Sequence, residues 1–152
     1  MTRADLAQEI WRICGVVATA LPLLKGETIE LVQAQLFGIA CAETELLTRR
    51  QYGYQHDTTG GAFGLWQMER AALESAARWA VQLPACDLAA CMLARVHMLA
   101  IGEPCGDGPE SRAAWWKAYW NTVAGKGTVE EYRERVAGVT REMEAAIETR
   151  VG

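Results

Sequence analysis

The sequence has little of several features that would restrict its function at once. Its 152 residues include only two histidines, and its five cysteines form no Cys-x-x-Cys pair, so we expect no metal site and no cofactor. The net charge of −4 argues against a nucleic-acid partner, which would need a basic surface. No apolar run is long enough to span a bilayer. What remains is an ordinary globular composition without a membrane span.

The cysteines and the N-terminus indicate where the chain is made. An odd number of cysteines is typical of free thiols that pack as small hydrophobic residues in a reducing compartment. Asp5 and Glu9 lie close to the start, where a secretion signal would be basic. We therefore expect an amphipathic packing helix and no signal peptide. The cysteines concerned are Cys14, Cys41, Cys86, Cys91 and Cys105.

Helical spacing of apolar residues dominates the chain and predicts one mostly α domain over residues 1–152. The last helix begins with Thr128 and Glu131, the spacing of a capping box. A stretch rich in Gly, Thr and Tyr predicts a loop or short hairpin around 51–63. The expected helices cover about 5–24, 28–50, 65–79, 86–100, 111–122 and 128–150.

The second expected helix carries a carboxylate on its apolar face. Glu43 follows Ala40 by one turn, whereas Glu45 belongs to another face. Burial raises the pKa of a carboxyl group, and a protonated carboxyl near neutral pH is what a general acid requires. The alternative is a structural Glu that pairs with Arg49 or Arg50. The face consists of Ile29, Val32, Leu36, Ile39, Ala40, Glu43 and Leu47.

A glycine-rich turn follows, ending in Gly64, Leu65, Trp66 and Gln67. Small residues let a ligand approach the backbone closely, and Gln67 offers a donor and an acceptor to sugar groups. Trp66 offers a ring face on which a sugar can stack. The alternative is a simple entry into a helix with the Trp66 ring in the core.

Together, Glu43-Thr44 and the Gly-Leu-Trp-Gln turn resemble the signature of the lytic transglycosylase and goose-type lysozyme superfamily. Its catalytic Glu is usually followed by Ser, and its loop ends in a Gly-Leu-Met-Gln type turn. A later Ala-Tyr-Asn-Ala-Gly type motif is matched loosely by 118–122 and 125–127, with Trp120 between Tyr119 and Asn121. Either aromatic residue could take the family's tyrosine role. The amino-acid sequence of these motifs is most similar to that of phage-encoded members of the superfamily.

This resemblance implies a lysozyme-like fold and a muramidase that cuts the β-1,4 bond between N-acetylmuramic acid and N-acetylglucosamine. Glu43 would be the general acid/base, and Gly64, Leu65, Trp66, Gln67, Tyr119 and Asn121 would bind substrate. Phage members are made in the host cytoplasm without a signal peptide and act in the periplasm or cell wall, for lysis or for genome entry together with other virion proteins.

Two reaction outcomes are possible after the glycosidic bond is protonated. A transglycosylase forms a 1,6-anhydro product with Glu43 alone, whereas an inverting lysozyme needs a second carboxylate to activate water. Asp57 is the better candidate for that carboxylate, although an Asp before Thr-Thr-Gly-Gly is also typical of a turn. Glu69 is more simply explained as a negative charge that stabilises the N-terminal end of its helix.

Other residues are interpreted mainly as structural. We expect His97 and Trp115 to pack in or beside the core, and the last helix to be a solvated packing helix or a partner-binding face. His56, beside Asp57, could touch substrate. Two rival hypotheses remain: a virion structural or genome-ejection protein with a lysozyme-like fold and no catalysis, and an unrelated helical interaction module.

Overall fold

The structure is a computed structural model that describes residues 1–47, 65–67, 86–123 and 125–152. These residues are mostly helical and contain no strand, which confirms the mostly α fold class. The predicted hairpin around 51–63 and most of the helix predicted at 65–79 lie outside the described residues.

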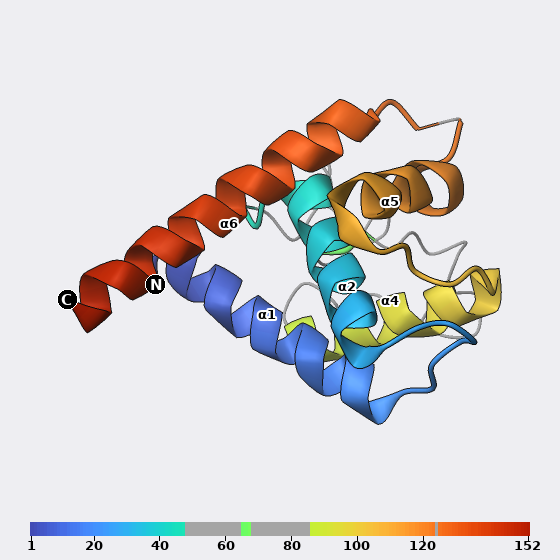
Figure 1. Cartoon of the computed structure of the whole chain (residues 1–152), viewed down its shortest axis with the longest axis horizontal. Helices are drawn as coiled ribbons and strands as arrows, with labels where there is room; N and C mark the ends of the chain where they lie inside the picture. The colour runs from blue at the N-terminus through green and yellow to red at the C-terminus, as the bar shows by residue number, and fades with distance from the viewer. Residues whose placement is uncertain (48–64, 68–85, 124) are drawn as a thin grey trace.

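Helix α2 (Ile29–Thr44) runs through the middle of the molecule, with α1 (Arg3–Ala20), α4 (Asp87–Ile101), α5 (Gly108–Trp115) and α6 (Val129–Val151) around it (Figure 1). Its burial extends almost all the way round, as its nearly continuous apolar sequence predicts. Each fully buried aliphatic side chain stabilises the fold by about 1.5–3 kcal/mol. The buried apolar positions are Val32, Leu36, Phe37, Ile39, Ala40, Cys41 and Ala42.

Helix α1 is shorter than the predicted range of 5–24. It begins at Arg3 behind a capping box between Thr2 and Asp5, and it ends at Ala20. Leu21 has extended backbone angles (φ −105°, ψ 156°) because the proline at position 22 disfavours a helical conformation in the residue before it. The predicted end near Leu24 is therefore wrong.

Helix α2 begins as expected, with the Thr28 side chain accepting a hydrogen bond from the N–H of Leu31, but it ends at Thr44. Glu45 and Leu46 both have positive φ and turn the chain out of the helix. The hydroxyl of Thr44 accepts a hydrogen bond from the N–H of Leu46 and so supports this turn. The predicted end near Arg50 is wrong, and Leu47 is exposed rather than part of the buried face.

The aromatic segment predicted as a short helix is helical but begins earlier. Helix α5 opens at Gly108 with Pro109 in its first turn, a common place for proline. It continues directly into a π-helical segment, η3 (Trp116–Asn121), which ends where Thr122 takes a positive φ. Helix α4 matches its predicted range closely.

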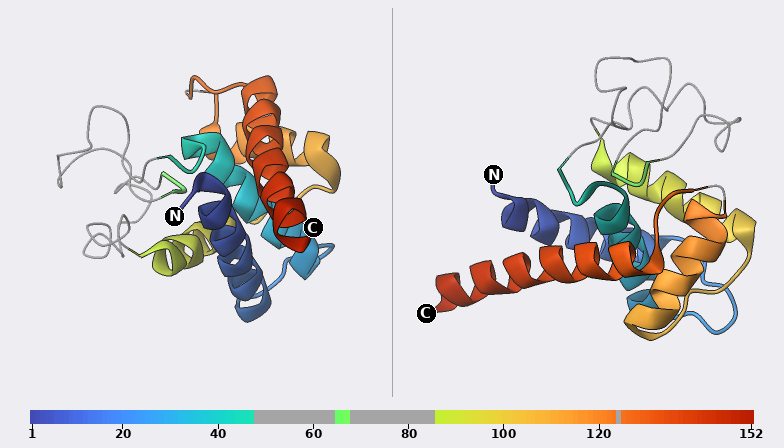
Figure 2. Two further views of the ribbon diagram at one scale, coloured as in Figure 1. Left: turned by 90° about the vertical axis from the view of Figure 1, so that its left-hand side faces the viewer. Right: turned by 90° about the horizontal axis from the view of Figure 1, so that it is seen from above.

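Helix α6 crosses α1, α2 and α5, and its C-terminal half lies beside the first turn of α1 (Figures 1 and 2). Arg3 pairs with Glu142, and Arg150 pairs with Asp5. The predicted capping box is present, because Thr128 and Glu131 exchange hydrogen bonds between side chain and backbone. At Gly38, a β-carbon would lie 1.9 Å from the hydroxyl of Tyr132, so only glycine lets α6 pack this closely on α2.

The remaining structural predictions concern thiols and His97. All five cysteines are free, and four are buried, with Cys86 exposed. His97 is half-buried with its ring 5.3 Å from that of Trp120, and burial lowers its pKa. Within the described ranges, no helix has the length and apolar character needed to cross a membrane.

Candidate functional site

Glu43 lies on the wall of a hollow of about 280 Å³ near the C-terminal end of α2. The hollow is bounded by three parts of the chain: the end of α2, the segment from η3 to the following loop, and the first turns of α6. Its lining residues are Ala42, Glu43, Trp116, Asn121, Lys126, Gly127, Glu131 and Arg135.

Burial dominates the electrostatics of Glu43. It raises the pKa of the carboxyl group from its ordinary 4.5 to about 7. A hydrogen bond from Trp116 and the positive charge of Arg135 lower the pKa but do not outweigh burial. Glu43 is therefore partly protonated near neutral pH, which suits a group that both gives and takes protons.

The indole of Trp116 holds the carboxyl group in place. Its Nε1–H donates to Oε1 of Glu43 at 2.8 Å, and its ring lies 5.4 Å from that of Tyr132. Within the residues that the structure describes, the hydrogen bond from Trp116 goes to Oε1 alone, which leaves the second oxygen of Glu43 for a proton and a substrate.

The π-helical segment brings two site residues to the same hollow. Residues five apart in an α-helix point about 140° away from each other. The wider turn of η3 reduces this angle, and Trp116 and Asn121 both line the hollow. Such π-helical turns are frequent at functional sites.

The loop after η3 packs tightly against this segment because it contains glycines. A β-carbon at Gly125 would lie 2.2 Å from the carbonyl oxygen of Asn121, and one at Gly127 would lie 2.5 Å from the ring of Trp116. Lys117 donates to Oδ1 of Asn121 and to the carbonyl of Gly125, which fixes the asparagine. The amide nitrogen of Asn121 faces Gly127 at the hollow, where it can donate to a ligand.

Helix α6 supplies the charges on the third side. Arg135 donates to the carbonyl of Ala42 and lies 3.6 Å from the carboxylate of Glu45, so it covers the C-terminal end of α2. Glu131 and Lys126 complete the wall. The hollow therefore combines a half-buried carboxyl group with two exposed groups of opposite sign, Glu131 and Lys126.

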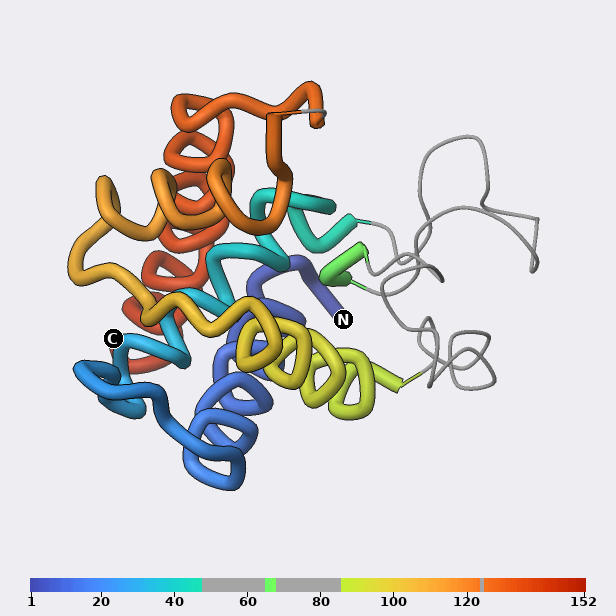
Figure 3. Tube along the Cα trace, turned by 90° about the vertical axis from the view of Figure 1, so that its right-hand side faces the viewer, coloured from blue at the N-terminus to red at the C-terminus, as the bar shows by residue number. Residues whose placement is uncertain are grey.

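The turn at residues 65–67 lies against the end of α2, as Figure 3 shows. The hydroxyl of Thr44 lies 3.5 Å from the carbonyl of Leu65, and the indole of Trp66 donates to the carbonyl of Leu36 at 2.8 Å. Leu65 and Trp66 are both fully buried. The predicted stacking of a sugar on Trp66 is therefore wrong, since its ring has no open face, and the core alternative holds.

Of the other predicted substrate-binding residues, Asn121 lies with Glu43 and Tyr119 does not. Tyr119 is 41% exposed and its ring packs on that of Trp115, away from the lining of the hollow. Trp115 is buried and donates to the carbonyl of Glu103, as a core residue does. Gln67 is half-buried with a positive φ and is not part of the hollow's lining. Gly64, Asp57, Glu69, His56, Arg49 and Arg50 lie outside the described residues.

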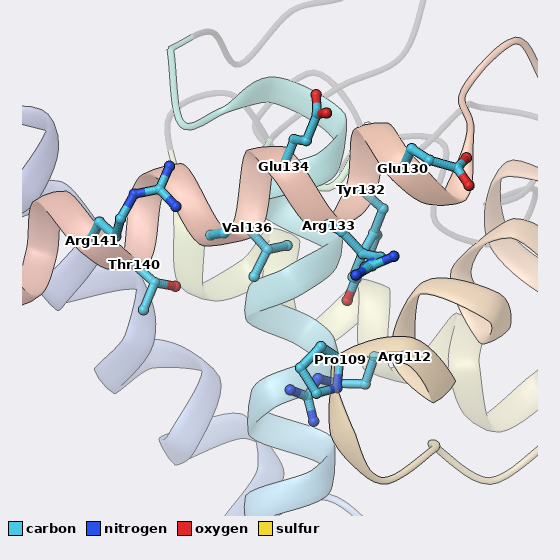
Figure 4. A pocket seen from close by; sticks show the side chains of 10 residues that line it. Pro109, Arg112, Glu130, Tyr132, Arg133, Glu134, Val136, Thr140 and Arg141 are labelled. Carbon is cyan, nitrogen blue, oxygen red and sulfur yellow. The ribbon is translucent and has the colours of Figure 1, made fainter.

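A second hollow, of about 730 Å³, lies between α5 and α6 (Figure 4). Pro109 and Arg112 line it from α5, and Tyr132, Arg133 and their neighbours line it from α6. Burial raises the pKa of Tyr132, so this phenol stays protonated and is no general base. The hydroxyl is also shielded from solvent against α2. We therefore place the candidate chemistry in the smaller hollow, which contains Glu43.

The sequence analysis included Lys126 and Gly127 in the loosely matched motif at 125–127 but not among the substrate-binding residues, and it did not assign Trp116, Glu131 or Arg135 to the site. The Gly-Lys-Gly segment was a usable signal for Lys126 and Gly127, since paired glycines often indicate a close approach. No pattern in α6 distinguishes Glu131 or Arg135 from its other charged residues. Within the described ranges, no group of His, Cys, Asp and Glu side chains is arranged to hold a metal ion.

The link between Trp116 and Glu43 can be tested directly. In Trp116→Phe the hydrogen bond to Oε1 is lost, and with it a contribution that lowers the pKa of Glu43. We expect the pKa to rise above about 7, measured by carboxyl carbon NMR titration of the two proteins. Trp115→Phe, which changes a buried tryptophan without touching Glu43, is the control. A pKa that stays the same or falls in Trp116→Phe would contradict the assignment.

Comparison of this chain with protein-family models, curated proteins and solved structures finds no match in any of the three.

Proposed function

We propose that this protein is a muramidase that cleaves peptidoglycan at the β-1,4 bond between N-acetylmuramic acid and N-acetylglucosamine, with Glu43 as the general acid. The observation that carries the proposal is the half-buried, hydrogen-bonded carboxyl group of Glu43, whose pKa of about 7 leaves it partly protonated at neutral pH on the wall of an open hollow. The sequence resemblance around Glu43 supplies the substrate class.

The proposed step begins with protonation of the glycosidic oxygen by Glu43, as the bond from C1 to that oxygen breaks and positive charge develops on the sugar ring. Asn121 can donate its amide N–H to a sugar oxygen in the hollow. Trp116 keeps the carboxyl group oriented throughout. The protein acts, on this proposal, as a phage-encoded enzyme in the bacterial cell wall, for lysis or for genome entry.

The first test is digestion of purified sacculi by the protein across a range of pH. We expect soluble muropeptides, and we expect the rate to fall about tenfold per pH unit above about 7, because the general acid must be protonated. Mass spectrometry of the products then separates anhydro sugars, lighter by one water molecule, from hydrolysed ends. A folded protein that released nothing from sacculi of several hosts would contradict the proposal and favour a structural protein of the virion.

A further inference from the structure

A second carboxylate, Glu131, lines the same hollow as Glu43 but comes from a different element. Glu43 lies in the last turn of α2, and Glu131 lies in the first turn of α6, 88 positions further along the chain. The packing of α6 on α2 brings the two together. Glu131 was not among the candidates for a second carboxylate that the sequence indicated.

The Glu131 side chain is held in position by the start of its own helix. Its Oε2 accepts a hydrogen bond from the N–H of Thr128 at 2.8 Å, while its own N–H donates to the hydroxyl of Thr128. In the described part of the chain, no group donates a hydrogen bond to its Oε1. One oxygen is thus anchored and the other can accept a proton.

The two carboxylates lie in opposite environments. Glu43 is half-buried, with protein around most of its carboxyl group, so burial penalises its charged form and favours the protonated acid. Glu131 is exposed, so water solvates its charge, and Lys126 and Arg135 on the same wall add positive charge nearby. Pairs of carboxyl groups whose surroundings differ in this way divide into an acid and a base in glycosidases.

The size of the hollow suits a water molecule between the two groups. Glu43 and Glu131 both line this hollow of about 280 Å³, which has room for the water molecule that inverting glycosidases hold between carboxyl groups about 6.5–9.5 Å apart. A transglycosylase, in which a single carboxylate acts as acid and then as base, requires no such partner.

We propose that Glu131 is the general base of the reaction and that the protein therefore hydrolyses the glycan with inversion, an inference that rests on the proposed muramidase function. Glu43 gives its proton to the leaving oxygen as the bond from C1 to that oxygen breaks. Water forms a new bond to C1 from the opposite face and transfers a proton to Glu131. One water molecule is consumed, and exchange with solvent returns both carboxyl groups to their starting protonation states.

The test compares Glu131→Gln with Glu130→Gln on peptidoglycan. Glutamine is also accepted at this position of a capping box, so Glu131→Gln keeps the helix start and removes only the base. Glu130 occupies the neighbouring position but lines the second hollow (Figure 4). We expect kcat to fall about 10²–10⁴-fold in Glu131→Gln and to stay within twofold in Glu130→Gln.

A second experiment separates a catalytic base from a structural residue. In Glu131→Ala, whose folded state is first verified by its melting temperature, added azide can attack C1 in place of activated water. We expect azide to restore bond cleavage and to yield an α-glycosyl azide, detected by mass spectrometry and NMR. A residue that only supports the fold would show no rescue.

The outcomes distinguish a failure of the role proposed for Glu131 from a failure of the proposed muramidase function. Anhydro products from the wild type, together with nearly full activity in Glu131→Gln, would overturn the role of Glu131 and leave the muramidase function intact. A wild type that releases nothing from sacculi would overturn the function itself.

Discussion

Glu43→Gln is expected to slow release of muropeptides from sacculi by about 10²–10⁴-fold, because a positioned general acid contributes about that much to the rate. The amide oxygen of glutamine can still accept the hydrogen bond from Trp116, so the variant should fold with its site intact. The measurement is the initial rate of release at pH 5–6, where Glu43 in the wild type is mostly protonated.

The matched control is Glu9→Gln, which makes the same chemical change on an exposed position of α1. It should retain full activity. Equal activity in Glu43→Gln and the wild type would remove Glu43 from the mechanism, whatever the products are.

Glu43→Gln also has an expected signature in stability that does not depend on the substrate. The folded-state pKa of about 7 lies above the ordinary value of 4.5, so the folded wild type holds this proton more tightly than the unfolded chain does. The stability that results is complete below pH 4.5 and is lost as the pH rises to about 7, by up to about 3 kcal/mol. The glutamine variant lacks this loss. The melting temperature of the variant minus that of the wild type should therefore be larger at pH 8 than at pH 4.

Breaking the buried ion pair between Glu27 and Arg95 is expected to cost about 3–5 kcal/mol of unfolding free energy, because it leaves an uncompensated charge in the core. Both side chains are fully buried, and the guanidinium donates to Oε1 of Glu27 at 2.7 Å. Arg95 also donates to the carbonyl of Pro22, and Glu27 accepts from the N–H groups of Leu24 and Cys105. The pair therefore joins the connection between α1 and α2 to α4, and Glu27 also joins it to the segment that precedes α5.

The experiment is urea unfolding of Glu27→Gln, Arg95→Met and the double variant. The double variant should be less destabilised than the sum of the two single variants, since neither charge remains. Glu110→Gln, which breaks an exposed pair with Arg133, should cost less than 1 kcal/mol. A loss below 1 kcal/mol in Glu27→Gln would contradict the role given to the buried pair.

The same pair predicts how acid acts on the protein. Burial raises the pKa of Glu27, but the hydrogen bonds from Arg95, Cys105 and Leu24 outweigh it and lower the pKa to about 2. A folded-state pKa below the ordinary value means that this stability is present above pH 4.5 and is lost as the pH falls through about 2.

The sequence alone determined the helical class, the central position of the second helix and the presence of Glu43 on it. These features follow from local spacing, because apolar residues three and four apart form one face of a helix wherever that helix lies. The capping box at Thr128 was likewise readable, since it involves only residues three apart. The end of α1 was equally local, in the step from Leu21 to the following proline, and was overlooked.

Only the tertiary structure decided what surrounds Glu43. The indole that holds it comes from Trp116, 73 residues away, and the arginine that lowers its pKa comes from α6. The spacing of residues in the sequence allows Trp66 to face either a ligand or the core. In the structure, its hydrogen bond to the carbonyl of Leu36 places it in the core. Periodicity shows which face of a helix is buried but not what packs against it. The proposed acid was therefore visible in the sequence, whereas its partners and its proposed base required the packing of α2, η3 and α6.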